Sequence, residues 1–139
     1  MKKKRLDIEF SFDFEVHGII TSMKGYKLAW EINRLLSLSL VRQEDVAVNH
    51  KEGVSHHTLF SFDSEVNHLK LIRNRPQEET DIKNLLTPEH PRFDFFLLSQ
   101  GDEMLTSNRL QEVLRNIPSV ELVAFIPLTA LKSKENFIF

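Results

Sequence analysis

Residues 6–17 have the sequence LDIEFSFDFEVH, in which apolar and polar residues alternate at every position. Leu6, Ile8, Phe10, Phe12, Phe14 and Val16 take one set of alternate positions, and Asp7, Glu9, Ser11, Asp13, Glu15 and His17 take the other. Successive side chains of a β-strand point to opposite faces, so this stretch predicts one long strand with an apolar face and an acidic face. The protein should therefore be built on a sheet.

The acidic face of this strand raises the question of a metal site. Its carboxylates are those of Asp7, Glu9, Asp13 and Glu15, and carboxylates two residues apart could ligate a hard cation. Calcium sites normally wrap their ligands in a loop with a turn glycine, which a regular strand does not provide. We therefore expect no metal, and interpret the face as a solvated surface. Its acids would pair with cations of neighbouring strands, for which Lys70, Arg73 and Arg75 are the candidates.

Length and composition indicate one soluble domain over residues 1–139. Hydrophobic residues make up 41% of the chain and charged residues 27%, the balance of an ordinary globular protein. The sequence has no cysteine, which excludes a disulfide framework, a thiolate zinc site and a cysteine nucleophile. No apolar run is long enough to span a membrane, and the basic start leads into the alternating strand rather than a signal-peptide core. We therefore expect a cytoplasmic protein.

The net charge and the absence of known motifs reduce the classes of molecule that we expect this protein to bind. A formal net charge of −2 gives no general attraction to nucleic acid or anionic lipid, so neither is an expected partner. The basic run at residues 2–5 is typical of a solubilising terminus. The sequence lacks a phosphate-binding loop, a dinucleotide glycine motif, a nucleophile elbow and a His-Glu-x-x-His helix, so we expect no bound cofactor.

Helical and strand patterns follow the first strand. Residues 26–38 carry apolar residues at helical spacing. Residues 46–48, 58–62 and 69–72 are short β-type runs that indicate antiparallel strands. Residues 76–84 are polar and without periodicity, which predicts an exposed, flexible loop.

The C-terminal half repeats the order of strand, helix and strand. Residues 93–99 are apolar on both faces apart from Asp94, which is typical of a central strand that is covered twice. Thr106 or Ser107 can cap the helix that follows, and residues 120–126 predict a last core strand.

Two tripeptides, Phe12-Asp13-Phe14 and Phe93-Asp94-Phe95, open these two series. The shared order indicates two β-α-β halves joined by a hairpin insertion, although chance similarity among amphipathic elements explains it equally well. We predict an α+β fold with a single, mainly antiparallel sheet of about five or six strands and two amphipathic helices on one face.

Histidines offer a second route to a metal site. His50, His56, His57 and His68 fall within the short β-type runs and could approach one another across strands. Adjacent His56 and His57 point to opposite faces, so at most one of them can join such a site. Scattered surface histidines are the favoured interpretation.

The segment TPEHPRFDF, residues 87–95, combines two prolines, two acids, a histidine and an arginine at the entrance of the central strand. Pro88, Glu89 and Asp94 are our candidate functional residues, because a buried acid at a strand entrance can have a pKa suited to proton transfer. The favoured alternative is structural: the prolines stiffen the approach while Glu89 or Asp94 accepts hydrogen bonds.

This segment resembles the motif of the IPExxxVDY family, a set of small bacterial proteins without an assigned function. Pro88, Glu89 and Asp94 match the motif, whereas Thr87, Phe93 and Phe95 replace its Ile, Val and Tyr. The likeness extends to the first strand and to the ending LKSKEN at residues 131–136. The loss of the tyrosine hydroxyl argues against any mechanism that would need it.

Two apolar features suggest contact with a partner. Tyr26 and Trp30 lie one turn apart beside the apolar stripe of the first helix, where they could line an interface or pack at the edge of the core. Residues 130–139 form an apolar C-terminal tail that should dock on the body or on a partner through residues such as Phe137 and Phe139.

These observations favour a non-enzymatic protein-interaction or scaffolding module, which we expect to be a homodimer or to bind an unknown protein. The alternative is a small-molecule-binding regulatory domain, because two β-α-β halves are similar in order to ACT-like domains. An enzyme that uses Glu89, His90 and Asp94 ranks last. A pocket beside residues 18–25 or Gly101 would favour the small-molecule alternative.

Overall fold

The computed structural model describes residues 14–50, 53–76, 85–101 and 105–137. Its elements in chain order are β1 (Glu15–Thr21), α2 (Gly25–Leu36), β2 (Val41–Arg42), β3 (Val46–His50), β4 (Gly53–His57), β5 (Leu59–Asp63), β6 (His68–Arg73), β7 (Phe95–Gln100), α3 (Ser107–Arg115) and β8 (Val120–Ile126). Two short 3-10 helices, η3 (Leu128–Ala130) and η4 (Lys134–Phe137), follow β8. None of the helices in these described ranges is both long enough and apolar enough to cross a membrane.

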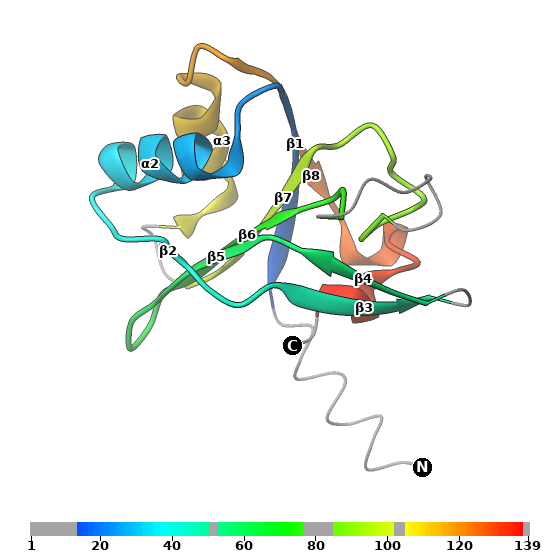
Figure 1. The fold of residues 1–139 in the computed structure, drawn as a ribbon. Helices are drawn as coiled ribbons and strands as arrows, with labels where there is room; N and C mark the ends of the chain where they lie inside the picture. Colours follow the sequence, from blue (N-terminus) through cyan, green and yellow to red (C-terminus); the bar gives the residue numbers. More distant parts are fainter. Residues whose placement is uncertain (1–13, 51–52, 77–84, 102–104, 138–139) are drawn as a thin grey trace.

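The main sheet confirms the α+β prediction. Its strand order is β2-β5-β6-β7-β1-β8, and every neighbouring pair is antiparallel. The units β1-α2-β6 and β7-α3-β8 interleave in this sheet, which is the split β-α-β-β-α-β arrangement. Four strands, β2 to β5, are inserted between α2 and β6. Of these, β2 and β5 extend the main sheet, whereas the β3–β4 hairpin forms a small second sheet (Figure 1).

Strand β7 lies in the middle of the sheet and is covered on both faces, as its sequence predicts. Phe95 and Leu97 pack with residues of both helices, whereas Phe96 and Leu98 pack with the β3–β4 hairpin and the C-terminal segment. Both helices lie on one side of the sheet (Figure 1). Each fully buried apolar side chain contributes about 1.5–3 kcal/mol to the free energy of unfolding. Both faces of the sheet carry such side chains, so both cores stabilise the domain.

The first strand runs further than the alternating pattern predicted. Residues 6–13 of that pattern lie outside the described part of the chain, whereas β1 continues beyond His17 through residues 18–21. Gly18 lies within this strand, and a Cβ at its position would come within 2.6 Å of the Phe93 ring. The close approach of that ring therefore requires a glycine.

The expected solvated face of β1 is partly a core face. His17 is 0% exposed, because α3 covers it and the Ser107 hydroxyl lies 2.9 Å from its Nε2. The neighbours of β1 are β7 and β8, so Lys70 and Arg73 of β6 are not cross-strand partners of Glu15. The predicted ion pairing is therefore wrong for Glu15, because it assumed the wrong strand order.

Local boundaries also needed correction. Helix α2 ends at Leu36 rather than at residue 38, because Ser37 adopts a left-handed conformation with φ 54°. Strand β4 was missed, since its sequence GVSHH has little apolar character. Thr106 is the N-cap of α3, and its hydroxyl accepts a hydrogen bond from the Arg109 amide at 3.4 Å.

The C-terminal tail docks on the body of the domain. Leu131 and Phe137 are buried in the core between the sheet and the hairpin. The Phe137 ring packs edge-on against Phe96 at 5.6 Å and against Phe14 at 6.5 Å. Phe139 and residues 77–84 of the predicted loop lie outside the described residues, whereas Pro76 is buried.

Candidate functional site

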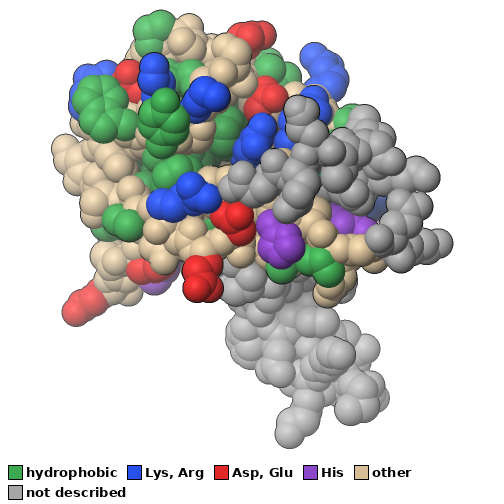
Figure 2. Space-filling view, in the orientation of Figure 1, with side chains coloured by type: hydrophobic (Ala, Val, Ile, Leu, Met, Phe, Trp, Pro, Cys, Tyr) green, Lys and Arg blue, Asp and Glu red, His purple; other side chains and the backbone are tan. Residues whose placement is uncertain are grey.

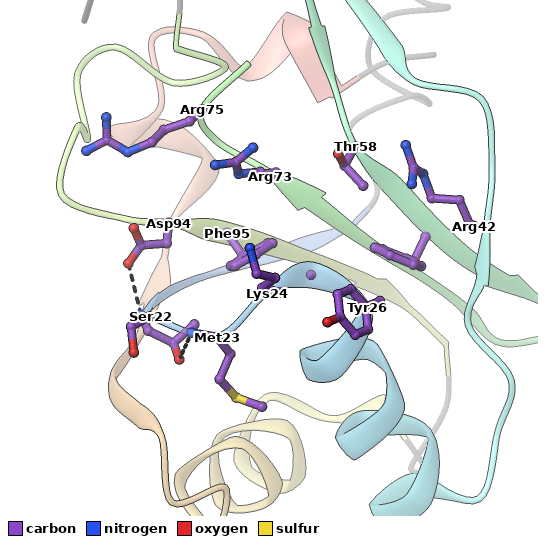
Figure 3. Close-up of a pocket in the computed structure, with 13 residues that line it drawn as sticks. Ser22, Met23, Lys24, Tyr26, Arg42, Thr58, Arg73, Arg75, Asp94 and Phe95 are labelled. Carbon is purple, nitrogen blue, oxygen red and sulfur yellow. Dashed lines mark hydrogen bonds between the residues drawn. The ribbon is translucent and has the colours of Figure 1, made fainter. Parts of the chain in front are cut away.

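A cavity of about 450 Å³ opens between the N-terminus of α2 and the helix-covered face of the sheet (Figure 3). Its walls come from the β1–α2 connection, from β2, and from the ends of β5, β6 and β7. The lining residues are Thr21, Ser22, Met23, Lys24, Gly25, Tyr26, Arg42, Thr58, Phe60, Arg73, Arg75, Asp94 and Phe95. This volume lies within the range of about 300–1,000 Å³ that is usual for small-molecule sites.

The start of α2 is shaped for close contact with a ligand. Lys24 is the N-cap in an extended conformation, no side chain caps the helix, and its first turn contains no acidic residue. The first amides of a helix lack intrahelical partners and carry a partial positive charge, which favours an anion. Gly25 brings this helix end close to the sheet, since a Cβ there would lie 3.2 Å from the Phe60 ring and 3.4 Å from Phe95.

Basic side chains from three separate segments line the same cavity: those of Lys24, Arg42, Arg73 and Arg75. Arg42 forms an ion pair with Asp45 at 3.0 Å, and its guanidinium lies 5.9 Å from the centre of the Phe60 ring. The other three cations form no ion pair with any residue that the structure describes. The cavity therefore presents positive charge that the described protein groups leave unneutralised.

Asp94 is the one carboxylate among these lining residues. Its Oδ2 accepts a hydrogen bond from the Thr21 amide at 2.9 Å, and its backbone amide donates to the Ile19 carbonyl at 2.8 Å. The Thr21 hydroxyl in turn donates to the Ser119 carbonyl at 2.8 Å. Asp94 thus holds the β1–α2 connection that forms one wall of the cavity.

The other motif residues do not reach this cavity. Glu89 accepts hydrogen bonds from the amide and the hydroxyl of Ser133, at 2.8 and 2.9 Å. Burial of Glu89 favours its neutral form, but these hydrogen bonds outweigh burial and lower the pKa of its carboxyl. Pro88 is exposed, and the His90 ring packs against Phe93 at 5.8 Å. Glu89 therefore anchors the C-terminal tail, and the Glu89, His90 and Asp94 side chains do not share the cavity.

Buried Asn74 fixes the course of the motif segment. Its side-chain amide donates to the carbonyls of His90 and Phe93 at 3.1 and 2.9 Å, while its oxygen accepts from the Thr87 amide at 2.8 Å. The Asn74 backbone amide donates to the Asp94 carbonyl at 2.9 Å. A single asparagine side chain thus ties the motif to the end of β6, next to the cavity.

Of the four histidines in the short strands, His50 and His57 share a contact with Ser55. The Nε2 atoms of His50 and His57 each lie 2.7 Å from the hydroxyl of Ser55, and the Nδ1 of His57 donates to the Arg73 carbonyl at 3.1 Å. Burial lowers the pKa of His57, and the nearby His50 adds to this effect. His56 is exposed and His68 pairs with Asp63, and among the described residues no three potential metal ligands come together.

The candidate interface residues separate into two groups. Tyr26 and Trp30 are 60% and 61% exposed on α2, and Arg34 lies over the Trp30 ring at 5.6 Å. Figure 2 shows hydrophobic side chains next to Lys and Arg side chains over this helix. Phe137 is only 3% exposed, so its ring packs inside the domain and is not available to a partner.

The sequence suggested a possible pocket beside residues 18–25, where part of this cavity lies, but it did not identify the cations that line it. Arg73 and Arg75 were assigned to the acidic face of β1, and Lys24 and Arg42 were not singled out. No linear motif joins these residues, because the cavity is assembled from the end of β1, from β2 and from the end of β6. The local signal was an uncapped helix start that combines a lysine with a glycine.

Comparisons of the chain with protein-family models, with curated proteins and with solved structures found no match. The site must therefore be interpreted from its own geometry.

Proposed function

We propose that this protein is a non-enzymatic binding module whose cavity takes a small molecule with at least two negative charges. The observation that carries this proposal is a set of three cations, Lys24, Arg73 and Arg75, that form no ion pair with a described residue. They surround a cavity that also receives the N-terminus of α2. Guanidinium groups and helix amides both hold phosphate and carboxylate oxygens well. Of the functions that the sequence suggested, the small-molecule regulatory domain has the stronger support.

Isothermal titration with inorganic pyrophosphate at low ionic strength tests this proposal. The parent protein should bind pyrophosphate, and Arg73→Ala should weaken binding about 10- to 100-fold, because a hydrogen bond to a charged group contributes about 1.5–3 kcal/mol. Lys27→Ala is the matched control, since this exposed cation lies on α2 but does not line the cavity. Absence of pyrophosphate binding, or an equal loss in both variants, would refute the proposal.

The exposed aromatic pair on α2 supports protein interaction as a second function. Exposed Tyr and Trp side chains are enriched in interfaces, and Tyr26 and Trp30 expose more than half of their surface. We expect the parent to form a homodimer and Trp30→Ala to dissociate it, while Trp30→Phe keeps it. Sedimentation equilibrium measures this, and a parent that stays monomeric at high concentration would reject the homodimer.

We also keep membership of the IPExxxVDY family as a proposal. Its support is the match of Pro88, Glu89 and Asp94 at the spacing of the motif. In the structure, Glu89 anchors the C-terminal tail and Asp94 holds the β1–α2 connection. No hydrogen bond between described residues joins Pro88 to the C-terminal tail or to the β1–α2 connection. In this interpretation the motif is a structural device that positions one wall of the cavity, and it is not a catalytic centre.

A further inference from the structure

We propose that the anion bound in this cavity is a nucleoside phosphate, with its phosphate at the arginine end and its base at the aromatic end. This inference rests on the proposed function above and adds the chemical class of the ligand. It depends on how charge and aromatic surface are distributed within the cavity.

The cavity has two chemically different ends. In Figure 3, Arg73, Arg75 and Asp94 lie toward one end, Tyr26 and Arg42 lie toward the other, and the ammonium group of Lys24 lies between them. The first end can bind an anionic group through several donors at once. The second end offers flat surfaces and little unpaired charge, because Arg42 is already paired with Asp45.

Planar groups at the second end are arranged to receive a ring. The Arg42 guanidinium is held over Phe60 at 5.9 Å and is fixed from the side by Asp45 at 3.0 Å. Tyr26, on the first turn of α2, is 60% exposed and lines the same cavity. Nucleobases stack on exposed tyrosine rings and on guanidinium planes. A ring placed here would cover aromatic surface that a compact anion would leave in water.

Size also favours a ligand larger than a free ion. A phosphate ion displaces only a few water molecules and would leave most of the roughly 450 Å³ filled with solvent. A nucleoside phosphate is larger than a phosphate ion and could fill more of this volume, with its sugar near Lys24, which lies between the two ends (Figure 3). Binding would then use both ends of the cavity together.

A free nucleotide fits the surroundings better than a nucleic-acid strand. Acidic side chains lie beside the aromatic end: Asp45 pairs with Arg42, and Glu31 pairs with Arg34 at 2.7 Å. The formal net charge of the whole chain is −2. A long polyanion would meet these acids beyond the cavity, whereas a single nucleotide would meet Asp94 as the one carboxylate of a lining that also carries Lys24, Arg42, Arg73 and Arg75.

Isothermal titration with a matched probe series tests the inference. The probes are ribose 5-phosphate, adenosine and the monophosphates of adenosine, guanosine, cytidine and uridine. At least one nucleoside monophosphate should bind ten times more tightly than ribose 5-phosphate, and adenosine should bind more weakly than its monophosphate. Tyr26→Ala should remove about 5- to 150-fold of nucleotide affinity, the range of base stacking on an aromatic side chain, and leave ribose 5-phosphate unchanged. Tyr26→Phe should retain the stacking, and Arg73→Ala should weaken both classes of phosphate.

The possible outcomes distinguish the nucleoside-phosphate inference from the proposed anion-binding function on which it rests. Equal affinity for ribose 5-phosphate and every nucleotide, with both lost in Arg73→Ala, would overturn the nucleoside ligand and keep the anion site. Failure of every probe together with pyrophosphate would overturn both. A single-stranded oligonucleotide that binds more than tenfold tighter than any monophosphate would overturn the free nucleotide in favour of nucleic acid.

Discussion

Acidification should destabilise this protein through His17. Its side chain is fully buried beneath α3, and burial lowers its pKa from 6.5 to about 4. Above pH 6.5 the histidine is neutral in both the folded and the unfolded states, so its contribution to stability is fully present. Between pH 6.5 and 4 the unfolded chain takes up a proton that the folded protein excludes, and stability falls. From pH 7 to pH 5 this linkage removes about 2 kcal/mol from the free energy of unfolding.

Urea denaturation of the parent and of His17→Leu at pH 7 and pH 5 isolates this contribution. Leucine removes the titrating group, and the Ser107 hydroxyl keeps its hydrogen bond from the side-chain amide of Gln111 at 3.0 Å. The parent should lose about 2 kcal/mol more than the variant over this pH interval, while other groups such as His57 contribute equally to both. An equal loss in the parent and in His17→Leu would show that the buried histidine does not couple folding to pH.

Three further substitutions test local features of the fold, each by urea denaturation. Gly18→Ala should lower stability by about 1–3 kcal/mol because its Cβ overlaps the Phe93 ring, and adding Phe93→Val should recover part of the loss; a neutral Gly18→Ala would contradict the packing. Ser37→Gly should raise stability by about 0.5–1 kcal/mol by relieving the left-handed conformation at the end of α2, and a loss would argue against that conformation. Glu89→Ala should cost about 1–3 kcal/mol by releasing two hydrogen bonds of the C-terminal tail, whereas exposed Glu121→Ala should change little.

Elements with strong periodicity were predicted well. The last strand spans residues 120–126 as its apolar pattern indicated, but it lies at the edge of the sheet with Leu122 and Phe125 exposed rather than in the core. The N-cap of α3 was one of the two residues expected. Weak patterns failed, and β4 is the clearest example. Its strand is held by pairing with β3 and by inward-facing Ser55 and His57, which hydrogen-bond to each other. Polar inward-facing residues give no hydrophobic alternation, so sequence reasoning had no signal there.

The candidate site was only partly visible in the sequence. Asp94 lines the cavity, and the sequence singled it out because it interrupts an apolar strand. Arg73 was expected to pair with the acids of the first strand but lines the cavity instead, because its position depends on which face of β6 points to α2. That choice is fixed by the register of β6 against β7, where Arg73 is opposite Phe95. A strand's own residues do not specify its neighbour, so the cation cluster could not be read from the chain.

The sequence by itself determined the class of the fold. The alternation over residues 6–17, the apolar residues on both faces of β7 and the two amphipathic helices favour a sheet covered by helices, because this arrangement removes each apolar surface from water. Only the tertiary structure decided where Asp94, Arg73 and Tyr26 lie relative to one another. Strand order and register bring the start of β7, the start of α2 and Arg73 of β6 together, although they are far apart in the chain. Local sequence preferences carry no information about which strands become neighbours. The alternation over residues 6–17 therefore predicted a sheet. The cavity depends on the strands and the helix that pack beside the end of β1.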